Sequence, residues 1–420
     1  MKRLLLTCAL CGFAWIARGQ STLDTIGVTA LNSADPTLTG SGVNVVQIES
    51  SPDPLQYEVN PADVSQPDKL FTYRSTAGSS GTFPNRSGSE SNHADSVAQN
   101  FYALYGSVSP GVRHVSNYET SLFYRSVIVG ELDTTARVFN QSFEFGNHNA
   151  AQDEKYDNYI ARYHPVVASG IGDGGSVLTP ADCYNGLGVG AYGGSTSTGP
   201  AAGGRSKPDI TAPASATSYS TPLVSGAAAL LIQEGLRLKT NANAATDSRT
   251  VKALLLTGAA KPSGWSHTST APLDPNYGAG VLNVYNSYEE LMGGRYSPGT
   301  NGINASRGWS YGIITSKAKA AGTADYTIST GSSGALIATL VWNKGYGAAG
   351  INQISLFVFD SGGNQLAESV STVDNVQHIY LTGLSGGTYR IEVQKAAGRI
   401  GSAAVAAASC TYALAWDFGR

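Results

Sequence analysis

Charged and sulfur-containing residues are both scarce in this sequence. Asp, Glu, Lys and Arg make up 14% of the 420 residues, and there are four cysteines and two methionines. Beyond the amino-terminal segment, no stretch stays apolar for the roughly 20 residues that a membrane-spanning helix needs. The formal net charge of −3 disfavours nucleic acid and anionic membranes as partners, because a slightly acidic surface attracts neither.

Glycine, in contrast, is plentiful, with 50 residues. Low charge combined with many glycines indicates a well-packed globular chain with tight turns and disfavours a disordered one. A chain of 420 residues has room for one large domain and a smaller one.

The first 19 residues have the pattern of a signal peptide. Lys2 and Arg3 precede the apolar segment 4–16, and the segment 17–19 ends with small residues at the positions that a signal peptidase reads. Its removal takes away three basic residues and no acid, which changes the net charge from −3 to −6. We therefore expect a secreted, extracellular or periplasmic protein. The short distance to the first strand leaves no room for an amino-terminal propeptide.

Two cysteines, Cys183 and Cys410, remain after that cleavage, since Cys8 and Cys11 lie in the signal peptide. In an oxidising compartment the two could form a disulfide, but they belong to different predicted domains. Two free, buried thiols are an equally good interpretation of the sequence.

Residues 218–235 predict a buried helix, because the segment is apolar or weakly polar on all sides until Glu234. Pro222 is tolerated only in a first turn, which sets the start of the helix near Ser218. A serine there has an unpaired N–H and the positive end of the helix dipole beside it, which suits a nucleophile that must hold an oxyanion. The alternative is that Thr217 and Ser218 are ordinary N-caps.

Short apolar segments alternate with helical patterns as far as residue 293. We expect strands at 43–48, 122–130, 136–139, 166–169 and 186–192, and helices at 147–163, 247–259 and up to about 293. Strands that alternate with helices predict an α/β domain with a mostly parallel central sheet covered on both faces.

Two further residues have side chains that could assist a serine nucleophile. Glu49 follows the first predicted strand, at the end where open α/β sheets place their sites. His93 opens a helix for which Asn92 is the expected N-cap. A serine hydroxyl needs a base to take its proton, histidine titrates near neutral pH, and an acid fixes the histidine tautomer. Acid, histidine and Ser218 occur in one of the chain orders known for such triads. Taken singly, each residue could instead be a solvated loop acid, a surface histidine or a cap.

After residue 293 the pattern changes to short strands at even spacing. These are expected at 335–342, 354–359, 365–370, 378–381 and 388–394. In the second of them Ile354, Leu356 and Val358 would share one face, which is typical of a β-sandwich. We therefore expect domains at 20–293 and 308–420, joined by a linker at 294–307.

The segment around Ser218 resembles the serine signature of the subtilisin-like serine peptidases, Gly-Thr-Ser-Met-Ala-Thr-Pro-His-Val-Ala-Gly. The matching residues are Thr217, Ser218, Thr221, Pro222, Val224, Gly226 and Ala227. Residues 93–98 are similar to the histidine block of this family, and residues 45–50 to its first strand, with Glu49 in place of the usual aspartate. The resemblance covers about residues 26–293.

This resemblance implies a three-layer subtilisin-like domain in which Ser218 is the nucleophile, His93 the base and Glu49 the orienting acid. Residues 140–146 resemble the strand that lines the primary specificity pocket, which implies substrate-binding roles for Ser142, Phe143 and Glu144. The carboxy-terminal region looks like the jelly-roll β-sandwich found behind secreted subtilase domains.

One departure from the family concerns the oxyanion. The family carries an asparagine after its Ala-Ser-Gly run, whereas here Ala168-Ser169-Gly170 is followed by Ile171, and the loop contains no asparagine. Loss of such a donor costs about 10²–10³ in kcat. The Ser218 N–H would remain. Asp173 could serve only when protonated, as in the related sedolisins, which would imply an acidic optimum.

The leading hypothesis is a secreted serine endopeptidase that acts as a monomer on protein or peptide substrates. The alternative is a catalytically impaired subtilase fold used as a binding or surface module. An esterase is disfavoured because no Gly-x-Ser-x-Gly elbow surrounds Ser218. No cofactor is expected, although the turn acids Asp360 and Asp374 could bind structural calcium.

Overall fold

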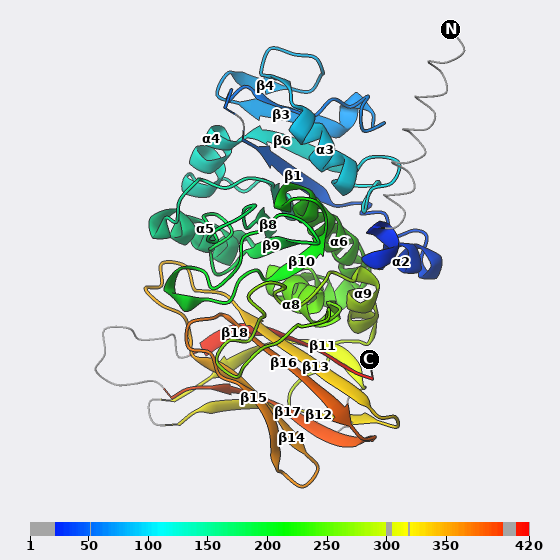
Figure 1. Cartoon of the computed structure of the whole chain (residues 1–420), viewed down its shortest axis with the longest axis vertical. Coiled ribbons are helices and arrows are strands. Elements are labelled where there is room, and N and C mark those ends of the chain that lie inside the picture. Colours follow the sequence, from blue (N-terminus) through cyan, green and yellow to red (C-terminus); the bar gives the residue numbers. More distant parts are fainter. Residues whose placement is uncertain (1–21, 51, 300–304, 318–319, 398–408, 420) are drawn as a thin grey trace.

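The computed structural model describes residues 22–50, 52–299, 305–317, 320–397 and 409–419. It consists of an α/β region followed by a region of two antiparallel sheets. The α/β region lies at one end of the molecule and both antiparallel sheets lie at the other (Figure 1). The predicted signal peptide lies outside the described residues. No helix among the described residues combines the length and the apolar character needed to cross a membrane.

An eight-stranded sheet forms the centre of the α/β region, in the order β10-β9-β8-β7-β1-β6-β3-β4. All neighbouring strands are parallel except β3 and β4, which form an antiparallel pair at one edge. The strands are β1 (Asn44–Glu49), β3 (Phe71–Ser75), β4 (Gly78–Ser80), β6 (His114–Glu119), β7 (Val138–Gln141), β8 (Val166–Gly170), β9 (Leu187–Tyr192) and β10 (Ile210–Pro213). A separate parallel pair joins β2 (Gln56–Glu58) to β5 (Ser89–Glu90).

Successive side chains of a strand point to opposite faces of the sheet, and both faces of this one are buried. Val45 belongs to one hydrophobic cluster, whereas Val46 and Ile48 belong to another. The first cluster includes residues of α2 (Val28–Ala34), α3 (Asn92–Phe101), α6 (Thr217–Arg237), α7 (Ala242–Ala245), α8 (Ser248–Gly258) and α9 (Val284–Met292). The second includes residues of α4 (Thr120–Phe123), the π-helix η2 (Tyr124–Val129) and α5 (Ala150–Tyr163). The predicted three-layer arrangement, with a mostly parallel sheet, is therefore confirmed. Short 3₁₀ helices occur at η1 (Asp68–Leu70), η3 (Ala202–Gly204) and η4 (Lys239–Asn241).

The strand predicted at 122–130 is wrong. The strand of this region is β6, which ends at Glu119, and the following residues form α4 and η2. The Glu119 carboxylate accepts hydrogen bonds from the backbone N–H groups of Ser121 and Leu122, so it caps the helix that follows the strand. A short apolar run rich in branched residues does not by itself distinguish a strand from a buried helix.

The carboxy-terminal region contains two four-stranded antiparallel sheets, as the sequence predicted for a sandwich. Its strands are β11 (Arg307–Thr315), β12 (Gly322–Thr330), β13 (Gly334–Trp342), β14 (Ile354–Asp360), β15 (Gln365–Ser369), β16 (Val376–Leu384), β17 (Gly387–Lys395) and β18 (Ser409–Phe418). Ile354, Leu356 and Val358 are fully buried between the sheets, in agreement with the predicted alternation. The strands β11, β12 and β18 were not predicted.

The sheet that contains β13 and β18 is covered on both sides. Leu340 of β13 faces the interior of the sandwich, whereas Val341 joins the large cluster of the α/β region. Between the two regions, Thr257 of α8 and Thr339 of β13 share a buried hydrogen bond of 2.8 Å. The sandwich therefore packs directly on α8. The last helix before it, α9, ends at Met292 and β11 begins at Arg307, with 300–304 outside the described residues; the domain limits and the linker at 294–307 stay predictions.

Cys183 and Cys410 are both buried and both free thiols. Burial raises the pKa of each thiol, to about 11 for Cys410, because the thiolate would lose its hydration. Of the two interpretations of the sequence, the structure therefore agrees with two free thiols and not with a disulfide.

Candidate active site

The predicted acid lies at the centre of the sheet. Glu49 is the last residue of β1, which pairs with β6 on one side and with β7 on the other. The strands β6 and β7 follow one another in the chain but lie on opposite sides of β1, so the order of the strands reverses at β1. Open α/β sheets place their ligands at the carboxyl ends of strands beside such a point. The topology therefore puts Glu49 where a site is expected.

Gln47 fixes the Glu49 carboxylate, and the sequence analysis missed this residue. Two positions earlier on β1, its side chain lies on the same face of the strand as that of Glu49. The Gln47 amide donates to Glu49 Oε1 at 2.7 Å and to the backbone oxygen of Ala94 at 2.9 Å. Gln47 is fully buried and Glu49 is 2% exposed. The spacing of two residues before a candidate acid was the available signal.

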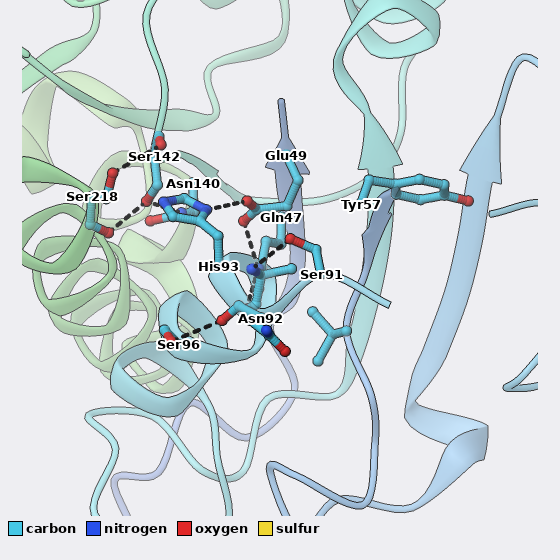
Figure 2. A network of polar contacts seen from close by, with 12 residues as sticks. Gln47, Glu49, Tyr57, Ser91, Asn92, His93, Ser96, Asn140, Ser142 and Ser218 are labelled. Carbon is cyan, nitrogen blue, oxygen red and sulfur yellow. Dashed lines mark hydrogen bonds and ion pairs between the residues drawn. The ribbon is translucent and has the colours of Figure 1, made fainter. Parts of the chain in front are cut away.

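His93 opens α3 and faces Glu49. Ser91, rather than the predicted Asn92, is the N-cap, and its hydroxyl accepts a hydrogen bond from Ala94 N–H. The His93 Nδ1 lies 2.7 Å from Glu49 Oε2 (Figure 2), a length typical of charge-assisted hydrogen bonds. Burial alone would lower the pKa of His93, but the hydrogen bond and charge of Glu49, with the charge of Asp173, outweigh it and raise that pKa. The contact leaves Nε2 as the ring nitrogen available to a substrate-side proton.

Ser218 is the second residue of α6, as the apolar pattern and Pro222 predicted. Neither Thr217 nor Ser218 is the N-cap; that position is Ala216, which has no capping side chain. The cap comes instead from Asp173, whose Oδ1 accepts from Thr217 N–H at 2.7 Å and from the Thr217 hydroxyl at 2.8 Å. Because the first N–H groups of a helix lack intrahelical acceptors, the N–H of Ser218 points out of the helix end.

The Ser218 hydroxyl is bonded to Ser142, which follows β7. Ser218 Oγ donates to the Ser142 backbone oxygen at 3.2 Å, and Ser142 Oγ donates to the Ser218 backbone oxygen at 2.8 Å. Asn140 holds Ser142 in turn, by a 3.0 Å bond from its amide to Ser142 Oγ. In the view of Figure 2 the His93 ring lies between Glu49 and the Ser142–Ser218 pair. The ring of Tyr219, next to Ser218, has its centroid 6.1 Å from that of His93.

The structure thus gathers Glu49, His93 and Ser218 from three elements at one edge of the sheet. Within the described part of the chain, only the first two are joined by a hydrogen bond, since Ser218 Oγ is directed to Ser142. A turn of the serine side chain about its Cα–Cβ bond is needed before Oγ can donate to His93 Nε2.

Two acids meet at the loop after β8, where the family resemblance implies an oxyanion donor: Asp173 belongs to the loop, and Glu144 reaches it from the segment after β7. Ile171 is fully buried in a small cluster with Val177, Ala181 and Ala201, so its side chain packs inward. Asp173 is exposed and caps α6, as described above.

Glu144 is the second acid of this region. Gly172 has a φ of +96°, and a Cβ there would lie 2.4 Å from Glu144 Oε2, so the carboxylate rests on the loop backbone. Burial, followed by the charge of Asp173, raises the pKa of Glu144.

The three predicted pocket residues follow β7 directly. Ser142 is bonded to Ser218, and Phe143 packs edge-to-face on Phe145 with ring centroids 5.5 Å apart. The Phe145 N–H donates to the backbone oxygen of Thr179 at 2.8 Å, which ties this segment to the loop after β8. Glu144 is the exposed member of the three. Their roles in substrate binding stay predictions.

A model of the subtilase family matches residues 88–281. These residues form a subtilase domain. The match includes His93 and Ser218 with their surrounding motifs, and confirms the resemblance seen in the sequence. Glu49 precedes the matched range, so its role rests on the contact with His93. The comparison with curated proteins found no match.

Solved structures of proteases resemble the subtilase domain at low identity. The CspB protease of Clostridium perfringens is 12% identical, with a TM-score of 0.49, over 65% of this chain and 99% of that one. The PatG macrocyclase in complex with peptide is 14% identical, with a TM-score of 0.47, over 64% and 98%. Tripeptidyl peptidase 2 is 13% identical, with a TM-score of 0.39, over 79% of this chain but only 40% of its own. Identities this low say nothing about substrate.

Proposed function

We propose that the protein is a serine endopeptidase that cleaves protein or peptide substrates through an acyl-enzyme. The observation that carries the proposal is the 2.7 Å contact between Glu49 and His93 at the edge of the sheet where the helix bearing Ser218 begins. The subtilase motif around the serine and the histidine supports it.

Each of the three residues has a distinct task in this proposal. Ser218 attacks the scissile carbonyl after its hydroxyl turns from Ser142 to His93. His93 Nε2 takes the hydroxyl proton and later gives it to the leaving amine. Glu49 fixes the tautomer with the proton on Nδ1 and stabilises the imidazolium that forms. The N–H of Ser218, which lies in the first turn of α6, and the positive end of the α6 dipole would stabilise the oxyanion.

A second candidate is a subtilase fold that binds polypeptide without efficient cleavage. Two observations favour it: the Ser218 hydroxyl is bonded to Ser142, and the loop at 171–175 presents the carboxylate of Asp173 where a neutral donor is needed. A carboxylate beside a developing oxyanion raises the barrier by like-charge repulsion.

A fluorophosphonate probe separates the two candidates. The purified protein and the Ser218→Ala variant are incubated with the probe from acidic to mildly alkaline pH, and the labelled residue is identified by mass spectrometry. Labelling of Ser218 in the wild type, with none in the variant, supports the peptidase. A folded wild type that remains unlabelled at every pH contradicts it and leaves the binding module.

We further propose that the protein acts as a monomer outside the cytoplasm, after cleavage behind residue 19. Amino-terminal sequencing of the exported protein tests this site. A mature chain that still carries the first 19 residues would contradict the proposal.

A further inference from the structure

A buried tyrosine contacts the residue that holds Glu49. Tyr102 is the C-cap of α3, the helix that carries His93 at its other end. Its hydroxyl donates to Gln47 Oε1 at 2.5 Å, and both side chains are fully buried. Burial raises the pKa of the Tyr102 hydroxyl well above its ordinary value, so the group stays protonated and acts as the donor. The contact joins the end of α3 to β1.

The polar contacts of Gln47 fix which way its amide faces. Its Nε2 donates to Glu49 Oε1 at 2.7 Å (Figure 2) and to the backbone oxygen of Ala94 at 2.9 Å. An amide nitrogen has two hydrogens, and both are used here. A reversed amide would bring its oxygen against the Glu49 carboxylate and the Ala94 carbonyl, which are both acceptors. The amide oxygen therefore faces the Tyr102 hydroxyl.

These contacts tie β1 to both ends of α3. At the first turn of the helix, His93 contacts Glu49 and Ala94 contacts Gln47. At the last turn, Tyr102 contacts Gln47. One continuous line of hydrogen bonds thus runs from Tyr102 through Gln47 and Glu49 to His93. In a buried network of this kind, the loss of one member weakens the bonds of the others.

Tyr73 of β3 differs from Tyr102 only in what its hydroxyl contacts. Both tyrosines are fully buried, and both rings lie beside Phe71, with centroids 5.9 Å and 6.0 Å from it. The Tyr73 hydroxyl donates to the backbone oxygen of Val59 at 2.9 Å. That bond ends on a backbone carbonyl, whereas the bond of Tyr102 ends on the side chain that holds Glu49.

We propose that Tyr102 is a positioning residue of the candidate active site, which acts through Gln47 to hold the Glu49 carboxylate against His93 Nδ1. The inference rests on the proposed peptidase function. Without the Tyr102 hydroxyl, Gln47 Oε1 is buried and has lost its donor, and the amide has lost one of the three contacts that fix it. Glu49 keeps its charge, but it is held less tightly and stabilises the imidazolium of His93 less.

The ionisable side chains around this line of hydrogen bonds come from several elements. They are Glu49, Asp173 and Tyr219 at His93, and Tyr73, Glu49 and Asp95 at Tyr102. Tyr102→Phe changes none of them and keeps the buried ring. A change in the pKa of His93 in this variant therefore reports the loss of the hydroxyl.

The test compares Tyr102→Phe with Tyr73→Phe in the purified full chain. The pKa of His93 is measured by NMR of histidine-labelled protein, and the rate of fluorophosphonate labelling of Ser218 is followed against pH. In Tyr102→Phe we expect the pKa of His93 to fall by about half a unit, because a looser Glu49 favours the imidazolium less. The acid limb of the labelling rate should move to lower pH, and the rate above that limb should fall roughly threefold. Tyr73→Phe should lose similar stability and leave the pKa of His93 and the limb unchanged.

The Gln47→Leu background shows whether Tyr102 acts through Gln47. Gln47→Leu alone should lower the pKa of His93 at least as far as Tyr102→Phe does. When Tyr102→Phe is added to it, that pKa should not change further, because the connection is already broken. An unchanged pKa of His93 in Tyr102→Phe, an equal shift in Tyr73→Phe, or a full further shift in the double variant overturns the proposal. The NMR titration needs no turnover, so a wild type that the probe does not label would contradict the peptidase and still leave Tyr102 tested.

Discussion

The two sides of the candidate active site differ in how completely they are built. On the acid side, Glu49 is buried, held by Gln47 and bonded to His93 at 2.7 Å. On the serine side, Ser218 is bonded to Ser142, and Asp173 stands at the helix end. In the proposed mechanism, His93 is therefore positioned before substrate arrives, whereas Ser218 must turn first and the oxyanion would form near an acid.

The contrast has a physical origin in the supporting contacts. Glu49 and Gln47 lie on one rigid strand in the middle of the sheet, which fixes their side chains at low entropic cost. The exposed Asp173 lies on a glycine-rich loop, and its Oδ1 already accepts hydrogen bonds from the N–H and the hydroxyl of Thr217. Substrate binding is thus expected to reorganise the serine side and leave the acid side unchanged.

Removal of the Glu49 charge should have the largest effect. Glu49→Gln favours the wrong tautomer of His93, and we expect kcat/KM to fall by about 10⁴. The rate of fluorophosphonate labelling of Ser218 measures the loss, with circular dichroism to verify the fold. A loss below tenfold would show that Glu49 is not the orienting acid.

Asp173→Asn addresses the other side of the site. The amide keeps an oxygen for Thr217 and replaces the second carboxylate oxygen with a donor, so repulsion of the oxyanion becomes attraction. At neutral pH we expect kcat/KM to rise by about tenfold to 100-fold, a part of the 10²–10³ that one well-placed donor contributes. An unchanged or lower rate, with the Tm preserved, would mean that Asp173 serves only as the cap of α6.

Gln47→Leu tests whether the action of Glu49 on His93 depends on the hydrogen bond that Gln47 donates to Glu49. The change removes the donor to Glu49 Oε1 while the buried volume is nearly kept. We expect kcat/KM to fall roughly fivefold to tenfold, about 1–1.4 kcal/mol of transition-state stabilisation. Because a general loss of stability would leave the pH profile of kcat/KM unchanged, a shift of its acid limb is the decisive readout.

The smallest expected effect is a shift of the acid limb of the kcat/KM pH profile in the Asp173→Asn variant. The raised pKa of His93 means that its neutral, basic form is lost already at a pH above the usual histidine value of about 6.5. Since the charge of Asp173 contributes to that rise, its removal should lower the pKa of His93 and move the acid limb to lower pH. Asp68→Asn, which removes an exposed acid of η1, serves as the control and should leave the limb in place. A limb that moves upward would contradict the assignment.

Two strands of the sandwich show how far periodicity predicts tertiary surroundings. Ile354 to Val358 alternate between buried and partly exposed, as a strand with one solvated face does. The run at 335–342 is apolar almost throughout, and β13 proves to be buried on both faces, between the sandwich interior and α8. The continuous run indicated burial, but it did not indicate which element covered the second face.

Candidate site residues could be predicted from the sequence where a reactive side chain coincides with the predicted end of a strand or start of a helix. Glu49 ends a strand, His93 and Ser218 open helices, and each has a side chain suited to acyl transfer. The π-helix at Tyr124–Val129 was mistaken for a strand because its apolar run fits either structure. Gln47, Asn140 and Ser142 escaped attention as supports because a hydrogen-bond partner distant in the chain leaves no periodic trace.

The sequence by itself determined the subtilase domain, the α/β and all-β division, and the three residues proposed for catalysis, because periodicity and motif spacing are local properties. Tertiary structure decided how those residues meet. It brought Glu49 to His93 in spite of the longer side chain, turned Ser218 to Ser142, placed Asp173 at the end of α6 and joined Tyr102 to Gln47. Distances, burial and hydrogen-bond partners arise only when segments far apart in the chain pack together, so no local pattern encodes them.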